Sequence, residues 1–177
     1  MLKASQCSVK NSNFAGNNAT GYGGWVIRSD KCTLTDCSFT KNSAQNQGVV
    51  LAFDAIIERC NFTENSARSY AVIYCNNIAL KDSNFTANSA YRGAVYSSGG
   101  DVAVTNSIFT NNTADYGGVI YLENANTVNI DGCVFFNNSA IYSVSDIVWG
   151  TDDVRTTITI LNTNITASKS CEAIEPF

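Results

Sequence analysis

Six copies of one short phrase constrain the fold of this chain more than any other feature. The phrase is Phe-x-x-Asn, usually followed by a small residue, and successive phenylalanines lie 25, 23, 23, 24 and 26 residues apart. A repeat of this length is typical of solenoids, in which each unit is one supersecondary coil stacked on its neighbours. The phenylalanines are Phe14, Phe39, Phe62, Phe85, Phe109 and Phe135, and the asparagines are Asn17, Asn42, Asn65, Asn88, Asn112 and Asn138.

Alignment of the copies on the phenylalanine reveals the periodicity of strands. Mostly apolar residues stand seven and five residues before each phenylalanine, and Cys or Ser stands two residues before it. A spacing of two places side chains on one face of a strand, here the inward face. A third strand is expected after each asparagine, with a loop leading on to the next coil. These third strands are expected to begin at Gly23, Gly48, Ala71, Gly93 and Gly117.

These columns predict an all-β protein, a right-handed single-stranded parallel β-helix of about six to seven coils with three short strands per coil. Helical repeats are excluded by the spacing of two and by the frequent Asn, Ser, Thr and Gly. We expect residues 1–177 to form a single domain that is a segment of a longer chain. The repeats are expected at about 7–31, 32–54, 55–77, 78–101, 102–127, 128–157 and 158–170, and residues 169–177 match no column.

Equivalent side chains should lie on top of one another along the solenoid. The phenylalanines are expected to stack inside the core. The asparagines are expected at a tight bend, in the left-handed backbone conformation that Asn tolerates, with their amides hydrogen-bonded along the stack. Outward columns should bring opposite charges together, such as Asp36 with Arg59 and Lys41 with Glu64.

Composition excludes several classes of function. The net charge of -4 and the pI near 4.7 argue against nucleic acid as a partner. No apolar run is long enough to span a bilayer as a helix, and residues 1–8 lack the apolar core of an export signal. The chain contains no histidine and no Cys-x-x-Cys pair, so neither a metal nor another cofactor is expected.

The seven cysteines favour buried thiols. Cys7 shares an inward column with Cys32, and Cys37 shares another with Cys60. A small buried thiol is the ordinary role of such residues. Directly stacked strands could also approach disulfide distance, so that alternative stays open.

Five tyrosines in the loop before the third strand are the candidate site for ligand contact. Such a stripe could bind a sugar or a protein, or it could cover the edge of the core, and solvent exposure separates the two interpretations. The five residues are Tyr22, Tyr70, Tyr91, Tyr116 and Tyr142.

Other candidate sites have ordinary structural explanations. Asp152 and Asp153 are interpreted as a solvated turn, because adjacent strand residues point to opposite faces and cannot act as a paired acid and base. No catalytic residue is therefore predicted. Six Asn-x-Ser/Thr sequons, at Asn18, Asn61, Asn84, Asn111, Asn137 and Asn164, could carry glycans in a secreted eukaryotic protein. An outward threonine row, Thr40, Thr63, Thr86 and Thr110, is interrupted at its ends by Ala15 and Phe136.

The pairing of Gly-Gly-[Ala/Val/Ile]-[Ile/Val] with Phe-x-x-Asn resembles the repeat of chlamydial polymorphic outer membrane proteins. The run from Phe109 to Ala140, FTNNTADYGGVIYLENANTVNIDGCVFFNNSA, looks like one full copy and the start of another. The resemblance covers about residues 7–145, although the double glycine occurs cleanly only at Gly23-Gly24 and Gly117-Gly118. It implies a right-handed β-helix at the cell surface that acts in adhesion and carries no catalytic residues.

We therefore expect a non-enzymatic cell-surface or secreted module that acts in adhesion or as a structural spacer. It would be extracellular or on the cell surface, at the outer membrane if the source is bacterial, and its partner would be a cell-surface protein or a carbohydrate. The alternative is a fragment of a carbohydrate-active β-helix protein, similar to a pectate lyase or glycoside hydrolase, whose catalytic residues lie elsewhere. Ice binding through the threonine row is the third hypothesis.

Overall fold

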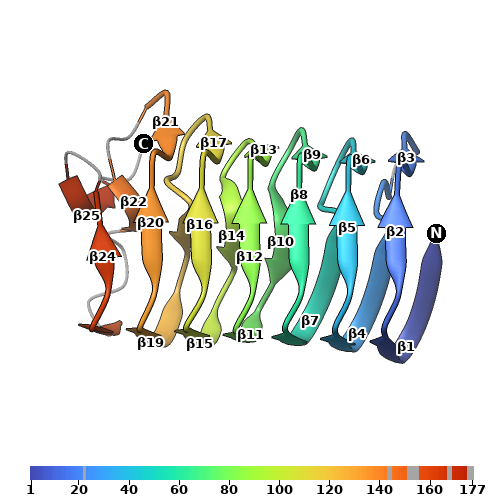
Figure 1. Ribbon diagram of the computed structural model, residues 1–177, viewed down its shortest axis with the longest axis horizontal. Coiled ribbons are helices and arrows are strands. Elements are labelled where there is room, and N and C mark those ends of the chain that lie inside the picture. The colour runs from blue at the N-terminus through green and yellow to red at the C-terminus, as the bar shows by residue number, and fades with distance from the viewer. Residues whose placement is uncertain (22, 143–144, 151–155, 167–168, 175–177) are drawn as a thin grey trace.

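The protein is a solenoid of parallel strands whose coils lie side by side along one axis (Figure 1). The computed structural model describes residues 1–21, 23–142, 145–150, 156–166 and 169–174. These residues form strands, bends and turns and contain no helix. Equivalent strands of successive coils pair in parallel to build three sheets. The predicted fold class, an all-β parallel solenoid with three sheets, is confirmed.

The seven-stranded sheet carries the phenylalanines of the repeat. Successive phenylalanines are direct register partners, as in the pairing of Phe39 with Phe62. Their rings stack with centroids 4.7–4.9 Å apart, and all except the half-buried Phe14 are completely buried. The strands are β2 Asn13–Ala15, β5 Ser38–Thr40, β8 Asn61–Thr63, β12 Asn84–Thr86, β16 Ile108–Thr110, β20 Val134–Phe136 and β24 Asn164–Ile165.

The six-stranded sheet follows the asparagines and consists of two-residue strands. Each strand pairs a Ser, Thr or Asn and then an alanine with the same positions of the next coil. All of these alanines except the half-buried Ala140 are buried and point into the close-packed core. The strands are β3 Asn18–Ala19, β6 Ser43–Ala44, β9 Ser66–Ala67, β13 Ser89–Ala90, β17 Thr113–Ala114 and β21 Ser139–Ala140.

The twelve-stranded sheet is continuous at the N-terminal end and forks at β7. In the first coils the strands β1 Leu2–Lys10, β4 Ile27–Thr35 and β7 Val50–Glu58 are unbroken. Beyond β7 one branch pairs through β10 and the other through β11. The first branch is β10 Ala71–Cys75, β14 Gly93–Ser97, β18 Ile120–Leu122, β22 Ser145–Gly150 and β25 Lys169–Ile174. The second is β11 Asn77–Lys81, β15 Gly100–Thr105, β19 Ala125–Asp131 and β23 Thr157–Leu161.

The prediction of a loop between the third strand and the next coil is therefore wrong for β4 and β7. Each of these is one continuous strand that forms the third strand of one coil and the first strand of the next. Later coils break the strand at Asn76, between Ser97 and Gly100, and between Leu122 and Ala125, and Asn124 in the last of these breaks has a positive φ of 55°. A residue in that conformation cannot continue a strand. The break, and not the pattern of apolar residues, separates the two branches.

Three of the expected third-strand starts are also wrong. The strands begin at Ile27, Val50 and Ile120, two to four residues after the glycines that were expected to open them. A Cβ atom on Gly24 would lie 2.2 Å from the carbonyl oxygen of Ala19, and one on Gly117 would lie 2.4 Å from that of Arg92. These glycines permit close approach of the backbone before the strand, which is why they precede it.

Each coil turns at two bends, and each bend contains one residue with a left-handed backbone. The expectation that the ladder asparagines adopt this conformation is wrong, because the residue before each of them has the positive φ instead. At that bend the residues are Gly16, Lys41, Glu64, Ala87, Asn111 and Asn137, with φ of 52–64°. At the other bend, before β2 and its equivalents, they are Asn11, Asp36, Arg59, Asp82, Asn106, Gly132 and Asn162, with φ of 47–63°.

The asparagine ladder satisfies the backbone at the bend between the seven-stranded and six-stranded sheets. The Nδ2 group of Asn88 donates to the carbonyl oxygen of Phe62 (2.9 Å) and to Oδ1 of Asn112 (2.9 Å). Its Oδ1 accepts from the backbone N–H and from Nδ2 of Asn65 (2.9 and 3.0 Å). The same pattern recurs at Asn42, Asn65 and Asn112, so the position must carry a side chain with both a donor and an acceptor.

The C-terminal segment continues the solenoid further than the repeats predict. Residues 169–177 were expected to match no column, but β25 pairs in parallel with β22 along its whole length. Its residues take the place that β22 occupies in the preceding coil. The missing Phe-x-x-Asn phrase hides this coil from the sequence repeat.

Candidate functional site

An open groove of about 990 Å³ crosses six strands of the twelve-stranded sheet, from β1 through β4, β7, β11 and β15 to β19. Two outward columns of side chains form its sides, and a column of inward-facing residues forms its floor. The first column stands eight residues before each phenylalanine and contains Gln6, Lys31, Asp54, Asn77, Asp101 and Thr127. The second stands six residues before and includes Ser8, Thr33, Ile56, Ala79, Ala103 and Asn129.

The first column of the groove is a row of linked polar side chains. Nδ2 of Asn77 donates to Oδ1 of Asp54 (2.7 Å), and the backbone N–H of Asp101 donates to Oδ1 of Asn77 (2.8 Å). The hydroxyl of Thr127 donates to Oδ1 of Asp101 (2.7 Å). Lys31 is the register partner of Asp54 at the next coil. The row therefore offers alternating donors and acceptors along the axis, with one cation and two carboxylates.

The second column is more apolar in its middle. Ile56 is 54% exposed, and Ala79 is also exposed. The two residues are register partners on adjacent strands, and Ala103 follows in the next coil. A polar row beside a short apolar strip is the composition expected of a binding groove, since the strip contributes contact area and the row contributes orientation.

The predicted tyrosine stripe is divided in space. Tyr91, Tyr116 and Tyr142 form one stack with ring centroids 4.9 and 4.6 Å apart. Tyr142 is 67% exposed, and the other two are partly exposed. The stack therefore ends in solvent at Tyr142. Tyr22 lies outside the described residues.

Tyr70 belongs to a second aromatic cluster that the sequence did not indicate. Its ring contacts those of Tyr74 and Tyr96 at centroid distances of 5.1 and 5.7 Å. The guanidinium of Arg92 lies 5.3–5.4 Å from the rings of Tyr70, Tyr96 and Tyr121 and 3.1 Å from Oε2 of Glu123. Burial and the hydrogen bond to Glu123 raise the pKa of Tyr96. The cation and the rings thus stabilise one another, which gives this cluster a packing role.

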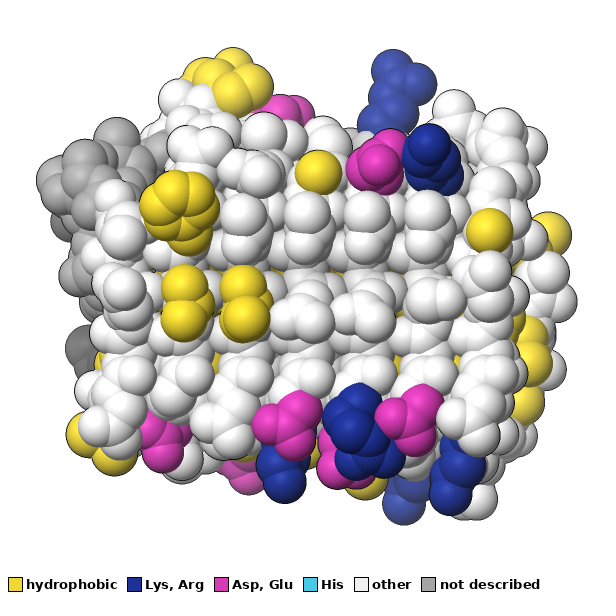
Figure 2. Space-filling model, in the orientation of Figure 1, with side chains coloured by type: hydrophobic (Ala, Val, Ile, Leu, Met, Phe, Trp, Pro, Cys, Tyr) yellow, Lys and Arg dark blue, Asp and Glu magenta, His cyan; other side chains and the backbone are white. Residues whose placement is uncertain are grey.

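The face formed by the seven-stranded sheet is flat and carries little charge. Figure 2 shows regular rows of polar side chains across its centre, with charged side chains gathered along its margins. Each threonine of the predicted row is the register partner of the next, from Thr40 to Thr110. The row beside it contains Asn61 and Asn84, which are hydrogen-bonded to each other (3.0 Å). The ends of the threonine row are Ala15 and Phe136, as the sequence indicated.

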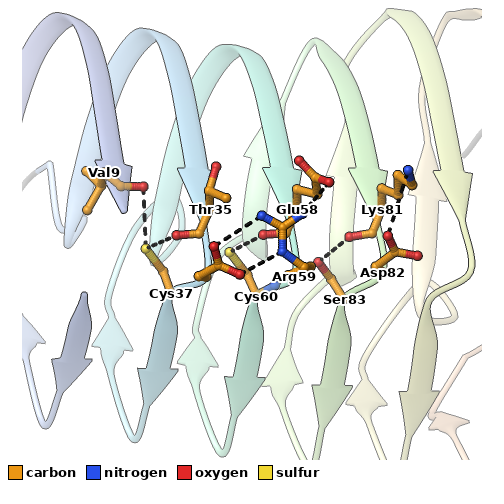
Figure 3. A network of polar contacts seen from close by, with 10 residues as sticks. Val9, Thr35, Cys37, Glu58, Arg59, Cys60, Lys81, Asp82 and Ser83 are labelled. Atoms are coloured by element: carbon orange, nitrogen blue, oxygen red, sulfur yellow. Dashed lines mark hydrogen bonds and ion pairs between the residues drawn. The ribbon is translucent and has the colours of Figure 1, made fainter. Parts of the chain in front are cut away.

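The predicted charge pairs lie at the bends. The guanidinium of Arg59 donates to both carboxylate oxygens of Asp36 (2.7 and 3.1 Å) and also pairs with Glu58 (Figure 3). Its hydrogen bonds lower the pKa of Asp36. Lys41 lies 3.6 Å from Glu64. All of these groups are well exposed, so they support register more than stability.

At the bend before β2 and its equivalents, a Cys, Ser or Thr follows each left-handed residue, and Cys37, Cys60, Ser83, Ser107 and Cys133 among them are buried. Sγ of Cys37 donates to the carbonyl oxygens of Thr35 (3.3 Å) and Val9 (3.5 Å), and Sγ of Cys60 donates to that of Glu58 (3.3 Å) (Figure 3). Ser83 makes the same contact with Lys81 (2.8 Å). Burial raises the pKa of Cys60 to about 11, so the thiol stays neutral. These residues complete the bends.

Other groups complete the inventory of the described residues. Among these residues no cluster of three His, Cys, Asp or Glu side chains could hold a metal ion, and no helix is long and apolar enough to cross a membrane. Asp152 and Asp153 lie outside this part of the chain. The asparagines of all six sequons are exposed.

The groove was missed by sequence reasoning, although its signal was present. The columns eight and six residues before each phenylalanine are outward on either side of an inward column, and the first is polar in every coil. The alignment emphasised the inward columns, which determine the fold. Outward columns become informative only when they are compared across coils.

Comparison with known proteins identifies the fold family but no individual relative. The family model described as a right handed beta helix region matches residues 1–171. None of the curated proteins compared with the chain matches it, and neither does any of the solved structures.

Proposed function

Because the chain belongs to the right-handed β-helix family, we propose that it is a non-enzymatic binding module, displayed at a cell surface or secreted, that holds an extended partner along its groove. The observation that carries this proposal is the groove itself, which continues across six strands. An extended polymer can make the same contacts coil after coil, because the strands repeat at about 4.8 Å. Adhesion is the role that such a surface supports.

A carbohydrate fits the chemistry of the groove better than a protein segment does. Amides, hydroxyls and carboxylates of the first column provide donors and acceptors in alternation, as a hydroxyl-rich chain requires. The short strip of Ile56 and Ala79 offers an apolar surface for the face of a sugar ring. The partner that we propose is therefore a cell-surface or extracellular polysaccharide.

A second candidate function, carbohydrate cleavage, is favoured by one observation. Asp54 and Asp101 lie in the same groove column, two coils apart. Two coils correspond to about 10 Å between backbones, close to the range of about 6.5–9.5 Å between the carboxyl groups of inverting glycosidases. Each carboxylate, however, already accepts a hydrogen bond from a neighbour in the same column, Asp54 from Asn77 and Asp101 from Thr127. Binding without turnover is thus the first proposal.

The test measures binding and turnover on the same polysaccharides. The protein is immobilised, and polygalacturonate, mannan and xylan are passed over it in a surface plasmon resonance experiment. Ala79→Trp should fill the middle of the groove and lower affinity at least about tenfold. Ile108→Trp, on the flat face of β16 where Ile108 is 44% exposed, is the matched control and should bind as the parent does.

Release of reducing ends or unsaturated products is measured in parallel. Binding without release supports the proposed module. Release that is lost in Asp54→Asn or Asp101→Asn, with binding retained, would establish the second candidate. If Ala79→Trp and Ile108→Trp bind equally well, the groove is not the site. A different outcome would be that none of the three polysaccharides binds and that the protein instead captures a surface protein, with Ala79→Trp blocking the capture. The partner would then be a protein and not a carbohydrate.

A further inference from the structure

Two thiols lie against each other at the N-terminal end of the groove floor. Cys7 on β1 and Cys32 on β4 are direct register partners in a parallel pair, and their Sγ atoms are 2.9 Å apart. Neighbouring strands are about 4.8 Å apart, which lies within the range of about 4.4–6.8 Å between the Cα atoms of disulfide-linked cysteines. The spacing of the two strands is therefore compatible with a disulfide between these residues.

Access to the pair is asymmetric. Cys7 is half-buried on β1, an end strand of its sheet, so a small reagent has better access to it than to Cys32. Cys32 is 2% exposed, and burial together with the neighbouring Cys7 thiol raises its pKa. The order of reaction follows from this difference, because an accessible thiolate attacks first and the buried thiol completes the exchange.

A second stacked pair provides an internal comparison. Cys37 and Cys60 are both buried within the bends, and each thiol donates to a backbone carbonyl oxygen of its own bend. They occupy equivalent positions of adjacent coils, as Cys7 and Cys32 do, but neither lines the groove. Stacking is thus common to both pairs, whereas a partly exposed thiol, that of Cys7, is specific to the first.

We propose that Cys7 and Cys32 are a modification site at which a small-molecule disulfide, such as oxidised glutathione, introduces a cross-link between the first two coils. The thiolate of Cys7 attacks one sulfur of the reagent and releases one molecule of thiol. The sulfur of Cys32 then attacks Cys7 in the mixed disulfide, gives up its proton to solvent and releases the second thiol. One protein S–S bond forms as one reagent S–S bond breaks, so the protein loses two electrons and two protons and the reagent gains them.

The test compares folded protein treated with oxidised glutathione and with a reducing agent. Intact mass should fall by two hydrogen atoms, and digestion without reduction should join the peptide that contains Cys7 to the one that contains Cys32. Cys7→Ser and Cys7→Ala should both abolish this product, and Cys60→Ser should leave it unchanged. Hydrogen exchange of the β1 amides should slow at least about tenfold on oxidation, because the link restrains opening of the first coil.

Three outcomes would overturn the proposal. One is a folded protein that keeps both thiols free under oxidised glutathione, and another is a product that joins Cys37 to Cys60 instead. The third is a stable mixed disulfide on Cys7 that Cys32 does not resolve. Circular dichroism of each variant shows that it is folded, and the Cys7→Ala variant separates loss of the thiol from any effect of a new hydroxyl.

Discussion

At the scale of single residues, each asparagine of the ladder satisfies backbone groups of the neighbouring coils. Asn88 is 1% exposed, and its amide is engaged on both sides by neighbouring coils. Asn88→Ala leaves the backbone N–H and Nδ2 of Asn65 without an acceptor and the carbonyl oxygen of Phe62 without a donor. Because each unsatisfied buried group costs about 1–3 kcal/mol, we expect the free energy of unfolding to fall by at least about 3 kcal/mol in urea denaturation.

Asn17 at the end of the same ladder is the control for that change. It is half-buried, and its side chain makes one bond, from Nδ2 to Oδ1 of Asn42 (2.8 Å). Asn17→Ala should cost about 1 kcal/mol or less, because water replaces the lost partner. Equal costs for the two substitutions would show that the ladder bonds do not determine stability.

The left-handed bends allow a stabilising substitution to be predicted. Ala87 has a φ of 54°, a conformation in which a Cβ atom is unfavourable and glycine is not. Ala87→Gly should therefore raise the free energy of unfolding by about 0.5–1 kcal/mol, measured from the denaturation midpoint. Ala90→Gly is the comparison, since Ala90 is buried in β13 and lies outside the positive-φ set. That change should lower stability by about 1 kcal/mol or more, and a fall for both variants would contradict the role assigned to the bend.

At the scale of strands, the repeat predicted which residues face the core but not where each strand ends. The inward columns are fixed by hydrophobic burial, which the sequence displays directly as a spacing of two. Strand ends depend on single residues such as Asn124, whose positive φ of 55° separates β18 from β19. They also depend on contacts between coils, such as the approach of Gly24 to Ala19. A pattern of apolar residues contains neither kind of information.

The candidate groove was harder to predict than the core for a related reason. Its residues lie on an outward face, where the sequence tolerates many side chains and no single position is distinctive. Asp54, Asn77 and Asp101 become a site only because parallel register places them on adjacent strands. The tyrosines illustrate the opposite error, because residues in equivalent loops, such as Tyr70 and Tyr91, are directed to different clusters by variable loop lengths.

The phenylalanine stack allows the element-level contribution to be measured. The Phe85 ring is fully buried and lies between the rings of Phe62 and Phe109, with centroids 4.7 and 4.9 Å away. Phe85→Ala should lower the free energy of unfolding by about 3–5 kcal/mol, because it removes apolar contacts and leaves a cavity between coils that cannot collapse. Phe14→Ala, at the half-buried end of the stack, should cost clearly less. Urea denaturation of both variants tests the difference, and equal losses would mean that the stack is not the central layer of the solenoid.

At the scale of the whole molecule, stability is distributed over contacts between neighbouring coils. In such a repeat each coil contributes its own stability and an interface with the next one, so the ends determine where opening begins. The disulfide that we propose would strengthen the N-terminal end. The C-terminal end differs, because Asp146 on β22 is 3% exposed within the core of the last coils. A buried carboxylate there makes the stability of that end depend on pH.

Asp146 gives this dependence a definite sign. Burial raises the pKa of its carboxyl to about 6, against 3.8 for the unperturbed group, while a hydrogen bond from Asn138 acts in the opposite direction. Between those two values the folded state binds the proton and the unfolded state does not, so the free energy of unfolding should fall as pH rises from about 4 to about 6. Above that window both states are ionised and this group causes no further change.

Thermal unfolding of the parent and of Asp146→Asn across this range tests the assignment, because the neutral amide removes the titration. The difference in melting temperature should shift in favour of the variant as pH rises and then become constant. A difference that stays the same from pH 4 to pH 7 would show that Asp146 titrates in the folded solenoid as it does in water.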